Sequence, residues 1–265
     1  MNYLFITFLF LFSMSCFHPL KLEAKIPKLL VLIISSDNYP GSPFPHPYRQ
    51  LQQVWSSYAH LDPSHVEAYF IRGNPNLTAE VELEGDVLWS RTEECVKPGI
   101  LNKTILSMEY FLSRLHEFDY VLRTNLSSFY VMPKLLEFLK TLPKNGVYCA
   151  SGDSFGSGCG YILSPDVVRR IVKNKKKLFN DNGDDDVVIG KFLKKKKIPL
   201  TPAPRTDLNC LEDWFRYKNE RKSNDFHFRV KNWIHDRRAI DDIYIYSELL
   251  KIYYDVNLSI NEVAL

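Results

Sequence analysis

An unbroken apolar stretch near the start of the chain constrains its fold more than any other feature. Residues 28–36 read KLLVLIISS, with no alternation of apolar and polar positions before the closing serines. Such a stretch is typical of a strand buried on both faces, as in a parallel sheet covered by helices. It therefore predicts an α/β domain, in which the loop after the first strand is a common place for a ligand.

Apolar stretches and helical patterns alternate along the rest of the chain. Further strands are predicted at residues 66–72, 85–90, 120–125 and 147–151, and a glycine-rich turn enters another strand within residues 156–163. Helices are predicted at residues 48–58, 103–115, 132–142, 165–174, 187–193 and 243–254. This alternation predicts a single domain built on a mainly parallel central sheet flanked by helices.

The composition agrees with one folded domain. The chain has 265 residues, 45% of them hydrophobic, and a formal net charge of only +3. There is enough apolar material for one sizeable core and no overall electrostatic case for a nucleic-acid partner. The lysine runs at residues 175–177 and 194–197 are interpreted as solvated helix ends, or as contacts to acidic lipid headgroups or acidic glycans.

The apolar run at residues 4–17 (LFITFLFLFSMSCF) is short for a membrane span, which needs about 20 apolar residues. It fits the hydrophobic part of a signal peptide or signal anchor, assigned to residues 1–24, with cleavage left open. Residues 25–265 would then form the catalytic-size domain. We expect it at a membrane or in the secretory pathway, in a Golgi-like or ER-like lumen, or exported if the chain is bacterial. A core strand at residues 4–17 is the alternative interpretation.

The cysteines do not indicate a metal site. Cys16 lies in the apolar run, and the other four cysteines are irregularly spaced, with no C-x-x-C pair. A zinc site is therefore not expected. The four cysteines suit either two disulfides in an oxidising lumen or buried thiols.

Three consecutive acids, Asp184, Asp185 and Asp186, precede the helix predicted at residues 187–193. One carboxylate could cap that helix, where the helix dipole favours a negative charge. Three acids exceed what a cap requires, because their mutual repulsion costs free energy unless cations or donors compensate it. An outward-facing carboxylate of this run could accept a proton from an attacking hydroxyl.

Two further segments carry groups suited to a ligand. Gly158, Cys159 and Gly160 belong to a turn whose alternate glycines let the backbone approach a ligand closely, although tight turns also use glycine. Residues 226–232 (FHFRVKN) alternate apolar and polar positions, so that an extended strand would place its polar side chains on one face. The polar side chains are His227, Arg229 and Lys231, and such a face suits a diphosphate. A half-buried edge strand with a solvated face is the alternative.

The order of these segments resembles the β-1,3-galactosyltransferase and Fringe-like family of GT-A-fold glycosyltransferases, over roughly residues 28–195. The segments that carry the resemblance are the strand at 28–36, the helix with Trp55, YFIRG at 69–73, EGDVL at 84–88, LNKT at 101–104, YVLR at 120–123, YILS at 161–164 and DDVVIG at 185–190.

The resemblance implies transfer, with inversion, of a hexose from a UDP- or GDP-sugar to a glycan hydroxyl. By the match of DDVVIG, Asp186 is the expected general base, with Asp185 beside it. The nucleotide sugar is expected at Ser35, Ser36, Arg123, Thr124, Asn125, His227, Arg229 and Lys231. The turn formed by Gly158, Cys159 and Gly160 is the expected donor or acceptor loop.

The chain departs from the family where an Asp-x-Asp motif would hold a divalent metal against the diphosphate. Thr124, Asn125 and Ser127 offer only neutral oxygens there, which bind Mg²⁺ or Mn²⁺ more weakly than carboxylates do. Either metal is a possible cofactor whose usual ligand motif is absent, so no metal ligand is assigned. Fixed cations can replace a metal at a leaving group. The candidates are Arg123, His227, Arg229 and Lys231.

Two other functions are open at this point. A catalytically inactive relative would bind a glycan or a nucleotide sugar, which the lost metal motif favours and the retained acids oppose. A metal-dependent hydrolase built around residues 184–186 is disfavoured, because the sequence has no His-rich motif to complete a two-metal site.

Overall fold

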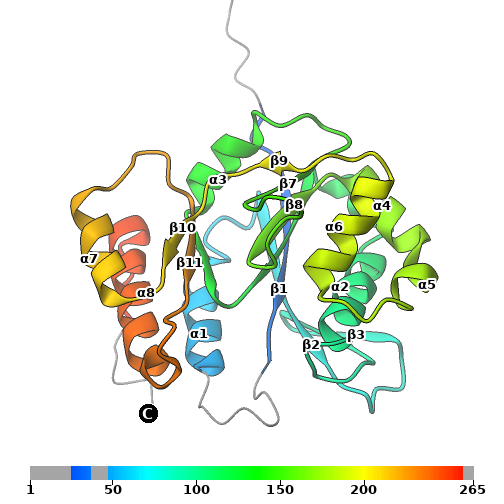
Figure 1. The fold of residues 1–265 in the computed structure, drawn as a ribbon, viewed down its shortest axis with the longest axis horizontal. Coiled ribbons are helices and arrows are strands. Elements are labelled where there is room, and N and C mark those ends of the chain that lie inside the picture. The colour runs from blue at the N-terminus through cyan, green and yellow to red at the C-terminus, as the bar shows by residue number, and fades with distance from the viewer. Residues whose placement is uncertain (1–24, 37–46, 259–265) are drawn as a thin grey trace, which may run out of the picture.

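The computed structural model describes residues 25–36 and 47–258. Within these residues the chain forms one α/β domain, with an eight-stranded sheet, a three-stranded sheet and flanking helices (Figure 1). The predicted single domain with helices around a central sheet is therefore confirmed. The predicted leader at residues 1–24 lies outside the described residues, and no described helix has the length and apolar character needed to cross a bilayer.

The large sheet contains strands from both halves of the chain. Its members are β1 (Leu29–Ile34), β2 (Val66–Gly73), β3 (Val81–Glu84), β4 (Val87–Ser90), β5 (Tyr120–Asn125), β7 (Tyr148–Ala150), β8 (Gly160–Leu163) and β9 (Thr201–Pro202). The small sheet consists of β6 (Ser128–Tyr130), β10 (Thr206–Leu208) and β11 (His227–Val230).

Eight helices and two short 3₁₀ segments complete the described part of the domain. They are α1 (Tyr48–Tyr58), α2 (Gly99–Tyr110), α3 (Met132–Leu139), α4 (Pro165–Lys173), α5 (Lys175–Leu178), α6 (Asp185–Lys195), α7 (Leu211–Asn219), α8 (Arg238–Tyr254), η1 (Leu115–Glu117) and η2 (His235–Arg237).

The large sheet is mixed, with order β3-β4-β2-β1-β5-β8-β7-β9. The pairs that join β4, β2, β1 and β5 are parallel, whereas β8 runs antiparallel to both β5 and β7, and β3 is antiparallel to β4. The sheet is thus mostly but not purely parallel.

The connections from β1 and into β5 create a switch point in the sheet. The chain leaves β1 for β2 on one side, and later returns to form β5 on the other side of β1. Connections that diverge in this way leave a crevice at the carboxyl ends of the two strands, which is where open α/β sheets bind ligands. The register places Ile34 beside Asn125, so Ser35 and Asn125 lie at this edge.

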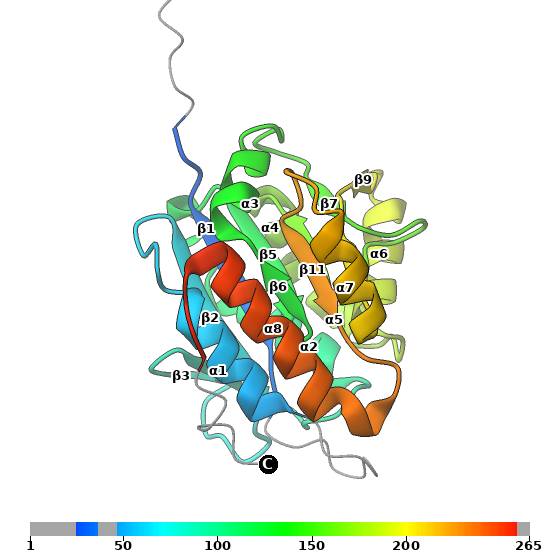
Figure 2. The same cartoon turned by 90° about the vertical axis from the view of Figure 1, so that its left-hand side faces the viewer.

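Both faces of β1 are buried, which explains its unbroken apolar sequence. Leu30 and Leu32 pack in a core beneath α2, α4 and α6, whereas Val31 and Ile33 pack on the other face with residues of α1 and α8. Side chains of a strand alternate between faces, so a strand covered on both sides can be apolar at every position. Figure 2 shows α8 lying beside α1.

Several predicted boundaries change in the structure. The strand predicted at 85–90 is a hairpin, since Gly85 has φ +60° between β3 and β4, a turn conformation that glycine adopts without strain. The helix predicted at 103–115 is α2, which begins at Gly99 because Leu101 extends the buried stripe of Ile105 and Met108. Helix α7 was not predicted, because only Trp214 and Tyr217 form its buried side.

The cysteines of the described residues are free thiols: Cys95, Cys149, Cys159 and Cys210. Burial raises the pKa of Cys149 to about 12, so this side chain is a neutral thiol of the core. Of the two alternatives for these four cysteines, the structure shows thiols.

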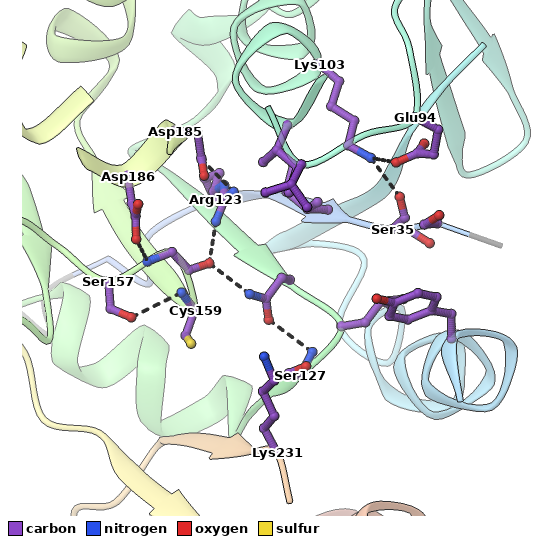
Figure 3. A pocket seen from close by; sticks show the side chains of 18 of the residues that line it. Ser35, Glu94, Lys103, Arg123, Ser127, Ser157, Cys159, Asp185, Asp186 and Lys231 are labelled. Carbon is purple, nitrogen blue, oxygen red and sulfur yellow. Dashed lines mark hydrogen bonds and ion pairs between the residues drawn. The ribbon is translucent and has the colours of Figure 1, made fainter. Parts of the chain in front are cut away.

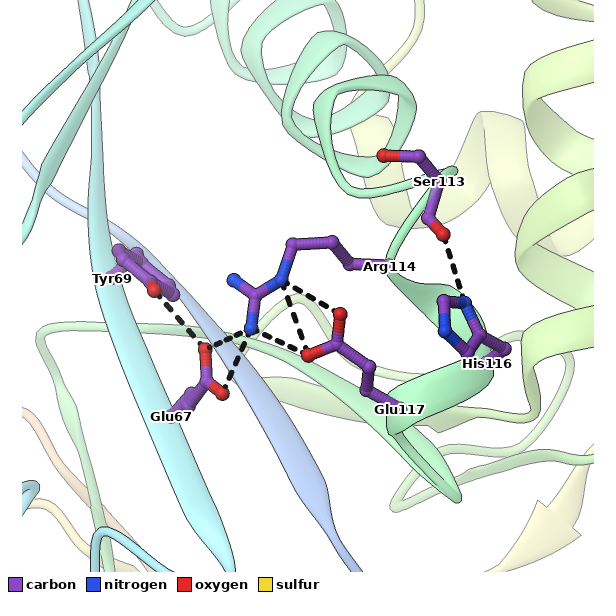
Figure 4. A network of polar contacts seen from close by, with 6 residues as sticks. All are labelled: Glu67, Tyr69, Ser113, Arg114, His116 and Glu117. Atoms are coloured by element: carbon purple, nitrogen blue, oxygen red, sulfur yellow. Dashed lines mark hydrogen bonds and ion pairs between the residues drawn. The ribbon is translucent and has the colours of Figure 1, made fainter.

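A polar network joins the segment after α2 to the beginning of β2 (Figure 4). Arg114 forms ion pairs with Glu67 and Glu117 at 3.0 and 2.7 Å, and Tyr69 donates to Glu67. Its charged groups are more than a third exposed, so their contribution to stability is small. Because Glu67 lies near the amino end of β2, the network lies away from the crevice at the carboxyl ends.

Tyr254 anchors the end of α8 to the domain. Its hydroxyl accepts from the Met132 N–H at 2.7 Å and donates to the Tyr130 carbonyl at 2.7 Å, and its ring stacks on Tyr58. We predict that Tyr254→Phe lowers the free energy of unfolding by about 1–3 kcal/mol, because both backbone groups lose their partner inside the protein. Urea denaturation measures this change. Tyr244→Phe on the same helix is the matched control, and equal losses in the two variants would contradict the prediction.

Candidate functional site

A cavity of about 380 Å³ opens at the carboxyl ends of β1 and β5 (Figure 3). Its walls come from the ends of these strands, the beginning of α2, the loop before β8, the amino end of α6 and the segment around η2. The residues with ionisable side chains that line it are Glu94, Lys103, Arg123, Asp185, Asp186, Lys231, His235 and Arg238.

The cavity gathers most of the site residues predicted from the sequence. Those that line it are Ser35, Ser36, Arg123, Asn125, Gly158, Cys159, Asp185, Asp186 and Lys231. Those outside its lining are Thr124, Gly160, His227 and Arg229.

A buried ion pair forms the floor of the cavity. Arg123 of β5 is 2% exposed, and its Nη2 lies 2.5 Å from Asp185 Oδ2 at the start of α6. Its Nη1 donates to the Gly158 carbonyl, and its guanidinium lies over the Tyr161 ring. Burial raises the pKa of Asp185, and Arg123 opposes that rise. The pair therefore connects β5, α6 and the loop before β8.

The neighbouring Asp186 is half-buried and held by backbone donors. The Gly158 N–H donates to its Oδ2 at 2.7 Å, and the Val187 N–H donates to its Oδ1 at 2.8 Å. A Cβ on Gly158 would lie 3.0 Å from this Oδ2, so glycine lets the loop approach the carboxylate. Asp184, the first acid of the run, occupies the N-cap position and pairs with Lys97 at 2.9 Å. The three acids thus have different surroundings. Asp184 and Asp185 each form an ion pair, whereas the Asp186 carboxylate accepts from two backbone N–H groups and lines the cavity.

The residues at the end of β5 hydrogen-bond to the loop before β8. Thr124 Oγ1 donates to the Cys159 carbonyl at 2.7 Å, and Asn125 Nδ2 donates to the Gly158 carbonyl at 3.0 Å. Asn125 Oδ1 in turn accepts from the Ser127 N–H at 3.0 Å. These neutral groups are occupied by the protein itself and do not suit a divalent cation, which prefers carboxylate oxygens. Among the described residues, no group of three His, Cys, Asp or Glu side chains could hold a metal ion.

Lys103 and Glu94 were not predicted as site residues. Lys103 of α2 is 1% exposed, and its ammonium donates to the Ser35 carbonyl at 3.0 Å and to Glu94. Burial lowers the pKa of Lys103, and Glu94 opposes that effect. The signal in the sequence was a lysine next to the apolar stripe of a predicted helix, but lysine at such a place is usually solvated.

Lys231 enters the cavity from the side opposite Lys103 (Figure 3). Burial lowers its pKa, and the neighbouring Arg238 and Arg229 lower it further. Arg238 itself pairs with Asp242 at 2.8 Å. Positive charges thus crowd this wall, and an anion bound there would relieve their repulsion.

His227 does not supply the positive charge expected of it. It lies outside the cavity lining, stacked on Tyr130 with ring centroids 4.3 Å apart and with Nε2 3.3 Å from Ser128 Oγ. Burial, and then Arg205, lower its pKa well below 6.5, so the imidazole is neutral near pH 7. Its strand, β11, lies between β10 and β6 and is not an edge strand. Arg229 points to Asn209, to which it donates at 3.1 Å.

Comparison of the chain with profiles of known protein families gives no match, and comparison with curated protein sequences gives none either.

The neutral His227 predicts a pH dependence of stability. Its folded-state pKa lies below the ordinary value of 6.5, so the stabilisation is complete above 6.5 and is lost as the pH falls further. We expect this one group to remove about 1.4 kcal/mol per pH unit below 6.5, until its folded-state pKa is reached. Urea denaturation at about pH 7.5 and about pH 5.5 should show a smaller acid loss for His227→Gln than for the wild type. The exposed control His116→Gln should keep the wild-type loss, and an unchanged acid loss in His227→Gln would contradict the assignment.

Proposed function

We propose that the domain is a GT-A-like inverting glycosyltransferase that moves a hexose from a nucleotide sugar to a glycan hydroxyl, without a divalent metal. One observation carries the proposal. Three cations of the cavity are paired with carboxylates: Lys103 with Glu94, Arg123 with Asp185, and Arg238 with Asp242. Among the residues that the structure describes, Lys231 and Asp186 form no ion pair, so a cation is left for a phosphate and a carboxylate for a proton.

The position of the cavity supports a nucleotide-sugar ligand. Parallel strands with a switch point between β1 and β5 are the arrangement in which α/β domains bind nucleotides. The volume, about 380 Å³, lies within the range of small-molecule sites. Ser35 lines the cavity, and its buried hydroxyl has no hydrogen-bond partner among the described residues. A bound ribose or base would supply that partner.

The diphosphate would bind at the Lys231 wall. A lysine ammonium is a compact point charge suited to phosphate, and the nearby Arg238 adds to the positive potential. In a partly buried site such charges act more strongly than in water and are already in position when the leaving group becomes negative.

Asp186 would act as the general base. The acceptor oxygen forms a bond to the anomeric carbon, on the side opposite the phosphate, and the bond between that carbon and the phosphate oxygen breaks. The nucleoside diphosphate leaves with the bonding electron pair, and the acceptor proton passes to Asp186. The two backbone N–H donors hold this carboxylate in one orientation, which general-base catalysis requires. The apolar residues 4–17 support delivery of the domain to a membrane or an exported compartment.

The first test is turnover. With UDP- and GDP-hexoses and a panel of glycan acceptors, we expect nucleotide release that needs the acceptor and resists EDTA. Asp186→Asn should lower kcat by about 10²–10⁴ while the donor Kd stays unchanged, because the amide cannot accept the proton. Loss of turnover with EDTA would contradict the metal-free mechanism. Donor binding without turnover at any acceptor would favour the inactive binding protein.

The second test is donor affinity. Lys231→Ala should raise the Kd for UDP or GDP about tenfold, because one charge-assisted contact to the diphosphate is lost. Isothermal titration calorimetry measures this change. Lys251→Ala removes an exposed lysine on α8 and should leave the Kd unchanged. Equal affinities in the two variants would place the diphosphate elsewhere.

A further inference from the structure

A cluster of apolar side chains lies exposed beside the cavity. Trp233 is 66% exposed and Ile234 is 52% exposed, both in the segment before α8, and Ile240, in the first turn of α8, is 61% exposed. Trp233 is unusual among the four tryptophans of the chain, since Trp55 and Trp214 are buried. Ile234 follows Trp233 directly, and exposed apolar side chains that adjoin one another mark binding surfaces more often than single ones do.

Trp233 is exposed although hydrogen bonds hold the backbone next to it in place. The Asn232 N–H donates to Asp242 Oδ1 at 2.8 Å, and its Nδ2 donates to Asp241 Oδ2 at 2.8 Å. Asn232 Oδ1 also accepts from the Ile234 N–H at 2.9 Å. The backbone on both sides of Trp233 is therefore fixed by hydrogen bonds, and this ordered turn leaves the indole in solvent.

The same turn belongs to the wall of the cavity. Lys231 and His235, two residues before and two residues after Trp233, both line the cavity. Two residues span at most about 7 Å of chain, so Trp233 lies at the rim. Because Trp233 is not part of the lining, it would contact a group that extends out of the cavity.

We propose that Trp233 is the stacking platform for a pyranose ring of the glycan acceptor. The ligand class rests on the proposed function. One face of a pyranose presents C–H groups, which are apolar and weakly positive, and the face of an indole is negative. The donor sugar and its diphosphate occupy the cavity, whereas the acceptor must leave it toward solvent, past the rim that Trp233 forms.

The charges within the cluster favour a sugar over a bilayer. Between Trp233 and Ile240 the segment exposes His235, Asp236 and Arg237. Such groups hydrogen-bond to sugar hydroxyls, whereas a carboxylate inserted beside the indole into a bilayer would be costly. The cluster therefore fits a ligand with one apolar face and a polar circumference.

The first test needs no turnover. Methyl glycosides of glucose, galactose, mannose and N-acetylglucosamine are titrated while tryptophan emission and its quenching by acrylamide are followed. Since Trp233 is the most exposed of the four tryptophans, we expect a saturable emission change and reduced quenching with at least one glycoside, both absent in Trp233→Ala. No response to any glycoside, or a response only to phosphatidylcholine vesicles, would overturn the platform.

The second test separates the platform from the catalytic proposal. With an active donor and acceptor pair, Trp233→Ala should raise the acceptor KM about tenfold and leave the donor KM unchanged. Trp233→Phe, which keeps an aromatic face, should recover part of that loss. Phe215→Ala removes an aromatic side chain on α7 that is 50% exposed and serves as the matched control.

The outcomes of the two tests are distinguishable. Turnover with an unchanged acceptor KM in Trp233→Ala would overturn the platform and leave the transferase proposal standing. A glycoside response without turnover under any condition would support the platform and count against the transferase.

Discussion

The buried pair of Arg123 and Asp185 is the interaction on which the site depends. Both charges are removed from water, and the cost of that removal is offset by the attraction of each charge for the other. Loss of either partner would leave an uncompensated charge inside the domain, at a cost of about 3–5 kcal/mol. The pair also sets the geometry around it. Arg123 holds the Gly158 carbonyl, and the Gly158 N–H orients Asp186. The position of the proposed base thus follows from a salt bridge one residue away.

The residues at the end of β5 give the site a fixed shape through neutral hydrogen bonds. Thr124 and Asn125 use their side chains to fasten the backbone of Gly158 and Cys159. Ser128 Oγ adds another donor to the Cys159 carbonyl at 2.6 Å. A loop held by this many donors needs little reorganisation when a ligand binds, which is an advantage for electrostatic stabilisation. The neutral side chains therefore contribute rigidity where carboxylates would contribute metal binding.

Much of the fold, and part of the site, could be predicted from the sequence. The run at 28–36 predicted a strand covered on both faces, because a run without alternating polar positions has no face suited to water. The position of Asp186 beside a cavity could be predicted, because it lies in a local acidic motif at the start of a helix. The burial of Lys103 could not be predicted, because its ammonium is satisfied by the Ser35 carbonyl, which is distant in sequence, together with Glu94 in the loop before α2. For His227, the alternation of apolar and polar residues correctly indicates a strand with two faces. It does not indicate that the rest of the domain covers the face on which His227 lies.

The cavity is assembled from the two ends of the described chain, since Ser35 follows β1 and Arg238 begins α8. A ribosome releases the chain from its amino end, so β1, β2 and β5 can pair while α8 is still unmade. Until the residues as far as Arg238 have been made, the cavity lacks the wall that carries Lys231 and Arg238. The complete cavity therefore exists only after the residues as far as Arg238 have been made, and a ligand that needs both of its sides meets them together only from that point on.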